Sequence, residues 1–200
     1  MSSLFRSKVA WLLCFSLGFA PLAYIVYLAA QGGLGAEPAK ALVEFLGEVA
    51  ILALMLVLAM SPLRKIKQLS GINRFRRMFG LFVFFYASLH VASYAFLLVD
   101  WQNFIEDIYS RLYVMAGFVA FIVLLSLAVT SPKVMVKKLG KRWKSLHRLV
   151  YVAVIAAVIH VFWQVRSDYT EAAFYAALAL LLLSFRFSYF KRRLFSVQRS

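Results

Sequence analysis

The sequence predicts an all-α integral membrane protein, a six-transmembrane helix bundle with both termini cytoplasmic. Hydrophobic residues make up 64% of the 200 residues and the mean hydropathy is +0.81, whereas ordinary globular chains are roughly 45–50% apolar. Long uncharged runs recur along the chain, and basic residues gather between them. No internal repeat is evident and every connection is short, so residues 1–200 are expected to form a single transmembrane domain.

Six apolar runs approach the roughly 20 residues that a helix needs to cross a bilayer. The second run reaches this length only if it includes Glu44 and Glu48, and the last only if Arg186 snorkels to the interface. The first run is long for a signal peptide and lacks a convincing cleavage site before Gly32, so it is expected to remain as an anchor. The predicted spans are 9–30, 42–63, 78–99, 112–132, 147–165 and 172–190.

Lysine and arginine are distributed unevenly among the connecting segments. All but three of the 23 basic residues lie before the first span, after the second, after the fourth or after the last. The other three, Lys40, Arg111 and Arg166, share the opposite side with all eight acidic residues. Because cytoplasmic loops carry the excess of basic residues, both termini are predicted to be cytoplasmic. The formal charge of +15 thus reflects topology, and nucleic-acid binding is not expected.

Cysteine usage limits the redox chemistry that the chain can perform by itself. The single cysteine, Cys14, lies in the first apolar run. One cysteine excludes an intrachain disulfide, a CxxC redox pair and a thiolate-ligated iron–sulfur cluster. Any redox function therefore requires a bound cofactor.

The three histidines are the best functional candidates, because an ionisable residue inside a membrane helix is costly unless it has a partner. His90 in the third span and His160 in the fifth lie near the outer ends of spans that run in the same direction. His147 lies at the cytoplasmic entrance of the fifth span, about 20 Å lower at a rise of about 1.5 Å per residue. Two histidines level on two helices provide what axial ligation of one haem iron requires.

Other interpretations of these histidines stay open. A histidine in a membrane helix also hydrogen-bonds a neighbouring helix without any ligand, and His147, between two basic residues, fits a solvated interface. On one regular helix His147 and His160 would point about 140° apart, so a single stack needs a local distortion or two haems at different azimuths. Zinc is a weaker alternative, because a further ligand would have to come from Glu44 or Glu48, which are expected to form a solvated helix end.

Five sequence segments carry a resemblance to a known family. The most specific is LGKRWKSLHRLVY at Leu139–Tyr151, followed by His160. The others are GGLGAEP at Gly32–Pro38, SPLRK at Ser61–Lys65, RRMFGL at Arg76–Leu81 and LHVASYA around His90. Through these segments the sequence resembles the MsrQ family, formerly YedZ, and the resemblance spans nearly the whole chain. This family of haem-binding membrane subunits is part of the ferric-reductase-like transmembrane superfamily, which includes NADPH oxidases.

The resemblance implies a haem b protein of the bacterial inner membrane. It implies that His90 and His160 hold an outer haem iron, in agreement with the topology. It also makes His147 a candidate ligand of a second, inner haem iron, although the third span there has Arg76 and Arg77 and no histidine. FMN is a further cofactor that the family implies, and no motif locates its site.

The resemblance also implies an electron-transfer role. Electrons would come from the quinone pool or from a cytoplasmic flavin reductase. They would pass to MsrP, a periplasmic molybdopterin methionine sulfoxide reductase that repairs oxidised envelope proteins. In this arrangement the chain is an electron-transfer subunit, and the catalytic step belongs to MsrP.

Two other functions fit the same sequence. A cytochrome b anchor or metal-ion reductase that serves a different oxidoreductase would keep the haem and change the partner. A six-span transporter without a cofactor would explain the topology but not the level histidines. The transporter alternative predicts a colourless purified protein.

Overall fold

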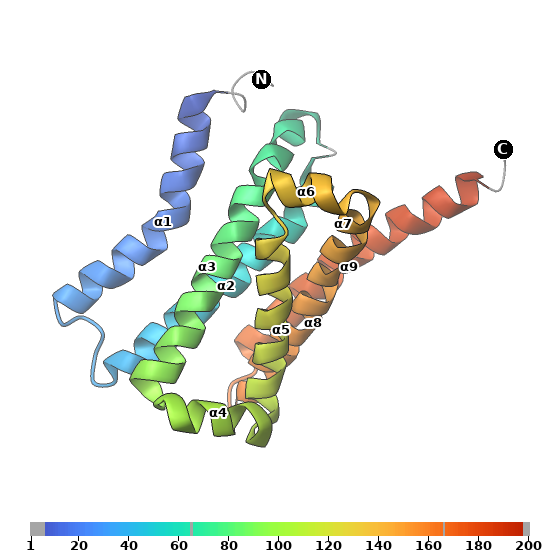
Figure 1. Ribbon diagram of the computed structural model, residues 1–200. Coiled ribbons are helices and arrows are strands. Elements are labelled where there is room, and N and C mark those ends of the chain that lie inside the picture. Colours follow the sequence, from blue (N-terminus) through green and yellow to red (C-terminus); the bar gives the residue numbers. More distant parts are fainter. Residues whose placement is uncertain (1–6, 65, 166, 198–200) are drawn as a thin grey trace.

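The computed structural model describes residues 7–64, 66–165 and 167–197, and only the backbone of residues 186–197. Arg166 lies outside the described residues, as does the side chain of Arg186. All regular elements of the described chain are helical (Figure 1). They are α1 (Lys8–Ala30), α2 (Pro38–Leu63), the 3-10 segment η2 (Lys67–Phe75), α3 (Arg76–Ser93), the π-helix η3 (Tyr94–Leu98), α4 (Trp101–Ser110), α5 (Leu112–Val129), α6 (Lys133–Leu139), α7 (Lys141–Leu146), the 3-10 turn η4 (His147–Leu149), α8 (Val150–Gln164) and α9 (Thr170–Val197).

Among the described residues, five helical stretches are long and apolar enough to cross a membrane. They are Lys8–Ala30, Pro38–Leu63, Lys67–Leu98, Leu112–Val129 and Lys141–Gln164. The apolar stretch of α9, Thr170–Phe185, is shorter. The prediction of an all-α membrane protein is therefore confirmed, whereas the sixth crossing and the cytoplasmic location of the termini stay predictions. The beginning of α1 and the far end of α9 lie toward the same end of the bundle (Figure 1).

The centre of the bundle lies between four helices, α2, α3, α5 and α8, and α9 packs beside them. α2 packs mainly against α3, α5 packs mainly against α8, and α9 packs against both α2 and α8. In a bilayer each of these helices satisfies its own backbone hydrogen bonds, so aliphatic side chains are free to fill the space between them. The most deeply buried members of this core are Leu54, Met55, Leu58, Val83, Ala153 and Val154.

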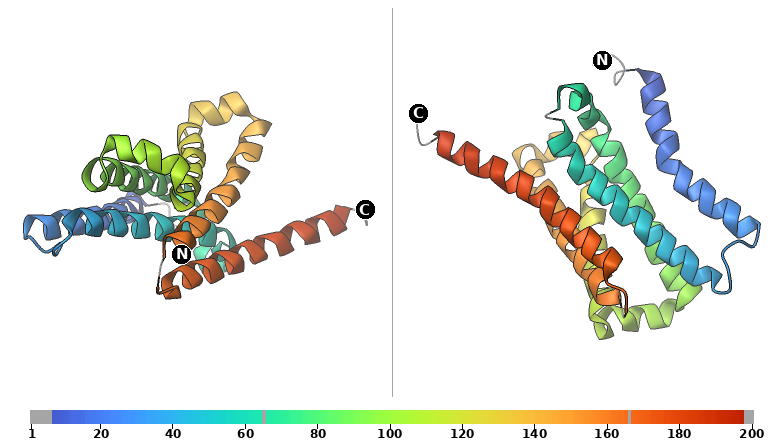
Figure 2. Two further views of the ribbon diagram at one scale, coloured as in Figure 1. Left: turned by 90° about the horizontal axis from the view of Figure 1, so that it is seen from below. Right: turned by 180° about the vertical axis from the view of Figure 1, so that it is seen from behind.

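The first helix, α1, stands apart from the other helices along much of its length (Figures 1 and 2). It packs on α3 through Phe15 and Phe19. The hydroxyl of Tyr86 in α3 also donates to the Gly18 carbonyl at 2.6 Å and accepts from the Leu22 N–H at 3.3 Å. Pro21 lies within this turn and has no N–H to offer to the helix. The Tyr86 hydroxyl therefore supports α1 at the turn that Pro21 interrupts.

Two backbone breaks shape the ends of the bundle. Asp100 has a φ of 68° and begins α4, with its side chain accepting from the N–H groups of Gln102 and Asn103. Gly140 has a φ of 51° and separates α6 from α7. Such values are uncommon except for glycine and for residues such as aspartate, whose side chain bonds locally. As a result, α4 lies across one end of the bundle and α6 and α7 across the other (Figure 1).

Candidate metal centre

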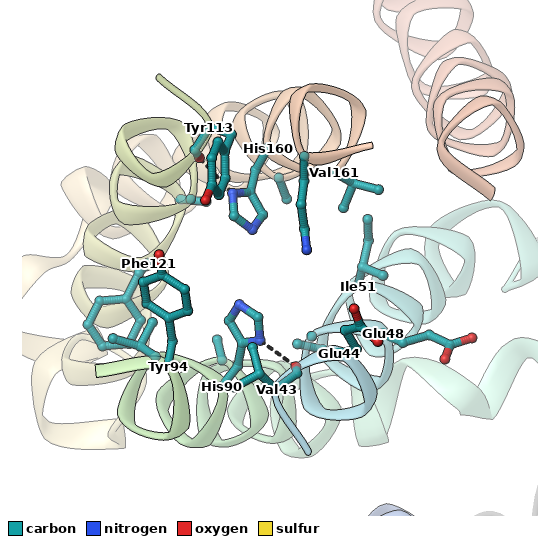
Figure 3. A pocket seen from close by; sticks show the side chains of 18 of the residues that line it. Val43, Glu44, Glu48, Ile51, His90, Tyr94, Tyr113, Phe121, His160 and Val161 are labelled. Carbon is teal, nitrogen blue, oxygen red and sulfur yellow. Dashed lines mark hydrogen bonds between the residues drawn. The ribbon is translucent and has the colours of Figure 1, made fainter. Parts of the chain in front are cut away.

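His90 and His160 face each other across the centre of the bundle. His90 lies in α3 and His160 lies in α8, and their ring centroids are 6.1 Å apart with the ring planes at 83° (Figure 3). The structure thus brings together the two histidines that the topology argument places at one level. Their common environment is a cavity between α2, α3, α5 and α8.

A backbone carbonyl of the adjacent helix holds each imidazole. Nδ1 of His90 lies 2.8 Å from the carbonyl oxygen of Val43, and Nδ1 of His160 lies 2.6 Å from that of Tyr113. Because a carbonyl only accepts hydrogen bonds, Nδ1 carries the proton in both rings. The Nε2 lone pair of each neutral ring is therefore available, and Nε2 points into the cavity (Figure 3).

The cavity has a volume of about 850 Å³, within the range of small-molecule and cofactor sites. Its wall beside the rings is apolar, whereas two acidic residues border it on α2. Glu44 and Glu48 are exposed and also line this cavity (Figure 3), and the solvated helix end stays a prediction. Apolar lining residues include Ile51, Val83, Phe121, Leu124 and Val161.

The spacing of His90 and His160 matches one metal ion between them. With metal–imidazole bonds of about 2 Å, two rings on opposite sides of one ion would have centroids about 6 Å apart. The observed separation is 6.1 Å. A ligating histidine almost always donates its other ring N–H to a carbonyl, carboxylate or water, as both rings do here. The pair therefore has the spacing and the tautomers that two histidine ligands of one metal ion would need.

A hydrogen-bonded network around Asp107 borders the cavity on the side of α4. Asp107 of α4 is only 5% exposed; it accepts from the Tyr94 hydroxyl at 2.5 Å and pairs with Nε of Arg111 at 2.7 Å. Arg111 also donates to the Tyr113 hydroxyl at 3.2 Å, and this contact is the largest cause of the raised pKa of Arg111. Tyr94 lies one helical turn after His90, and Tyr113 supplies the carbonyl that holds His160. The network thus links the segment that follows His90 to Tyr113, the residue whose carbonyl holds His160.

His147 does not join the other two histidines. It lines a second cavity of about 1190 Å³ near the end of the bundle where α6 and α7 lie. Its ring stacks on Trp143 with centroids 4.0 Å apart, and its Nε2 lies 3.3 Å from the Thr130 hydroxyl. His147 belongs to η4 and not to the regular helix α8, so the angle of about 140° calculated for one regular helix does not apply.

The second cavity is strongly basic. Five basic residues line it beside His147, and its wall also includes Asn73, Ser131 and Tyr151. An anionic or phosphate-bearing ligand is therefore better suited to it than a cation. The basic residues are Arg64, Arg76, Arg77, Lys144 and Arg148.

Comparison with known proteins shows the family. A family model described as "Ferric reductase like transmembrane component" matches residues 46–158, and no solved structure matches the chain. A Pectobacterium carotovorum protein named "Protein-methionine-sulfoxide reductase heme-binding subunit MsrQ" is 38% identical over 178 residues, which are 88% of this chain and 89% of the relative. Proteins of the same name from Salmonella arizonae and Salmonella paratyphi B are 37% and 38% identical over 190 residues, 92% of this chain and 96% of each relative. The chain belongs to the MsrQ family.

Membership of the MsrQ family confirms the resemblance carried by the sequence segments. The ferric-reductase match includes His90 and His147 and ends at residue 158, just before His160. His160 lies in α8, the helix in which that match ends. The MsrQ relatives cover the chain almost from end to end. The family assignment therefore rests on the whole bundle and not on a single motif.

Sequence reasoning found these histidines but missed the backbone groups that hold them and an internal repeat that relates them. Adding 70 to the numbers of Val43, Gly47 and His90 gives Tyr113, Gly117 and His160. The same offset relates Ser61–Pro62 to Ser131–Pro132. In both copies the carbonyl acceptor precedes its histidine by 47 residues. These matched Ser-Pro and Gly…His positions indicate an internal repeat with an offset of 70 residues, which the expectation of no repeat did not include.

Proposed function

We propose that this MsrQ-family chain binds haem b through His90 and His160 and carries electrons across the membrane. The observation that supports this function best is the facing pair of imidazoles, with centroids 6.1 Å apart and both Nδ1 atoms bonded to carbonyls. The names of the MsrQ relatives describe them as haem-binding subunits. Haem b fits a site that offers two neutral imidazole nitrogens inside an apolar cavity.

The residues of the chain bind, orient and shield the cofactor. Bound haem would supply one-electron chemistry at the iron. His90 and His160 would set the iron from both sides, and the carbonyls of Val43 and Tyr113 would fix the ring orientations and raise ligand basicity. Apolar side chains such as Phe121 would exclude water and so influence the reduction potential.

For the partners, we propose MsrP as the electron acceptor on the periplasmic side of the bacterial inner membrane. The chain has no catalytic residue of its own in this scheme, and MsrP reduces methionine sulfoxide. The electron donor would be the quinone pool or a cytoplasmic flavin reductase. The excess of basic residues at the predicted inner face supports docking of an acidic donor there, and the acidic loops would meet the acceptor outside.

His147 would contribute to a second cofactor site on the inner side. The cavity of about 1190 Å³, the ring nitrogen of His147 and the surrounding basic residues support this assignment. A second haem b with His147 as an iron ligand is one occupant, and FMN with its phosphate near the arginines is the other. His147 in this second site is independent of the outer pair, because it lies against a different cavity.

Electron delivery to MsrP tests the proposed function. The purified full chain is reduced with NADH and a flavin reductase, or with a quinol, and reoxidation of its haem is followed after addition of MsrP and methionine sulfoxide. We expect MsrP to reoxidise the haem of the unchanged chain and that of Tyr27→Phe, which changes an exposed position on α1. His90→Ala and His160→Ala should not support it. Reoxidation by a different oxidoreductase or by metal ions alone, and not by MsrP, would favour the anchor or metal-ion reductase.

A further inference from the structure

Gly47 in α2 and Gly117 in α5 lie directly against the rings of the two facing histidines. A Cβ atom at Gly47 would be 2.9 Å from both Nδ1 and Cε1 of His90. At Gly117 it would be 2.7 Å from Nδ1 and 2.9 Å from Cε1 of His160. Separations under 3.0 Å are essentially never seen for real Cβ atoms. Neither position therefore admits a side chain unless the imidazole moves.

Each glycine shares a helix face with the carbonyl that holds the same ring. Val43 and Gly47 are one turn apart in α2, and Tyr113 and Gly117 are one turn apart in α5, so each pair points the same way. The carbonyl fixes Nδ1 of the imidazole, while the bare glycine Cα lets the ring approach the helix backbone. A glycine inside a helix is less favourable than alanine, so its presence here needs a reason in packing.

We propose that Gly47 and Gly117 are positioning residues for the two haem ligands. Each lets an imidazole lie against the neighbouring helix so that Nδ1–H reaches its carbonyl while Nε2 faces the iron. This inference rests on the haem ligation proposed above. It goes further by assigning the ligand geometry to two residues that make no contact with the metal.

Gly47 and Gly117 are two instances of one arrangement within the chain. Gly47 and Gly117 stand at equivalent positions in the two copies, as do His90 and His160. A Cβ atom added at either glycine would lie under 3.0 Å from the imidazole, and each imidazole bonds the carbonyl one turn before that glycine. A chance contact at one glycine would not be expected to recur at the other.

The chemical consequence follows from the hydrogen bond that each glycine permits. An Nδ1–H bond to a carbonyl makes the imidazole a more basic ligand, which favours the ferric iron and lowers the reduction potential. A methyl group at the glycine would push the ring away, lengthen or break this bond and weaken the axial ligand. The haem would then bind less tightly, be easier to reduce and open one axial position to external ligands.

The test compares Gly47→Ala and Gly117→Ala with Gly18→Ala in the full chain. Gly18 is a matched control, because its added Cβ would lie 2.2 Å from the Phe82 ring and not near a histidine. Spectra are first recorded in native membranes, so that detergent losses do not decide the outcome. Haem affinity, midpoint potential, ferric low-spin EPR g-values and CO binding to the reduced protein are then measured after purification.

Haem binding should be about 10- to 100-fold weaker in Gly47→Ala and in Gly117→Ala, the effect typical of losing a partner that orients a metal ligand. They should also raise the midpoint potential, shift the g-values and allow CO to bind. Gly18→Ala should leave all four unchanged. Unchanged g-values, potential and CO behaviour in both variants would overturn the proposal, as would equal changes in Gly18→Ala. Failure of the haem proposal itself looks different, because the unchanged chain would then be colourless.

Discussion

The hydroxyl of Tyr94 donates a 2.5 Å hydrogen bond to the buried carboxylate of Asp107. This contact joins the π-helical end of the third span to α4, the helix that crosses the outer end of the bundle. Tyr94, Arg111 and Tyr113 all line the cavity that contains His90 and His160. The Tyr94–Asp107 pair therefore connects the lining of the candidate haem site to α4.

Tyr94→Phe should destabilise the protein by about 1–3 kcal/mol, because a buried carboxylate loses a hydrogen-bond donor. Asp107→Ala should cost more, since it also removes the partner of Arg111; the half-exposed Arg111 side chain limits that addition. Unfolding of the purified protein in mixed micelles measures the change. Glu106→Gln, on the exposed side of α4, is the matched control and should have no effect. Equal stability of all these variants would show that α4 is not held through Asp107.

Tyr86→Phe should release α1 from the bundle. The substitution removes the hydroxyl that bonds Gly18 and Leu22, at a cost of about 0.5–1.5 kcal/mol. Single cysteines placed in α1 and α3 should cross-link less efficiently in this variant. Tyr27→Phe changes an exposed tyrosine of the same helix and should cross-link like the unchanged protein. A Tyr86→Phe protein with undiminished cross-linking would contradict the role given to the hydroxyl.

His147→Ala should remove at most a subset of the bound cofactor, because His147 lines a cavity separate from the one between His90 and His160. Haem and flavin are quantified per chain in this variant and in His90→Ala. We expect the low-spin signal of the outer haem to persist without His147. Loss of all haem from His147→Ala would contradict the assignment of His90 and His160 to one haem and of His147 to a separate site.

Arg77→Gln should lower the occupancy of the inner cofactor several-fold and leave the outer haem intact. The change removes one positive charge from the cavity lined by Arg64, Arg77 and Lys144, where an anionic group would bind. Titration of the cofactor-depleted protein with haem and with FMN identifies the ligand that responds. Arg74→Gln, a basic position outside the lining of that cavity, serves as the control. Identical titrations of both variants would argue against an anionic ligand beside His147.

Much of the bundle could be predicted from hydropathy alone. Helix α1 begins within one residue of the predicted span, and α5 begins at Leu112 as expected. The facing of His90 and His160 followed from counting residues from the same interface, because the third and fifth spans run in the same direction. Such counting gives depth in the membrane, and depth was sufficient to pair these two residues.

Counting residues could not predict the direction in which a side chain points around its helix axis, or which backbone groups it contacts. The ring orientation of His90 depends on the Val43 carbonyl, which carries no side-chain signal in the sequence. Asp107 is one of the acidic residues predicted to lie on the outer side, yet its side chain in α4 is buried. The 3-10 turn at His147 likewise breaks the helical periodicity on which the angular argument relied. For Asp107 and His147 a local break in the helix determines where the side chain points, and for His90 a backbone carbonyl of the adjacent helix does.

The most direct test of the central claim is the reduced-minus-oxidised visible spectrum of the purified chain, with pyridine haemochrome quantification per protein. We expect a low-spin b-type spectrum that disappears for the most part in His90→Ala and in His160→Ala. A second equivalent of haem would be retained only through His147. A colourless protein after haem supplementation, or a spectrum that survives replacement of both His90 and His160, would contradict the proposal that these two histidines hold the haem.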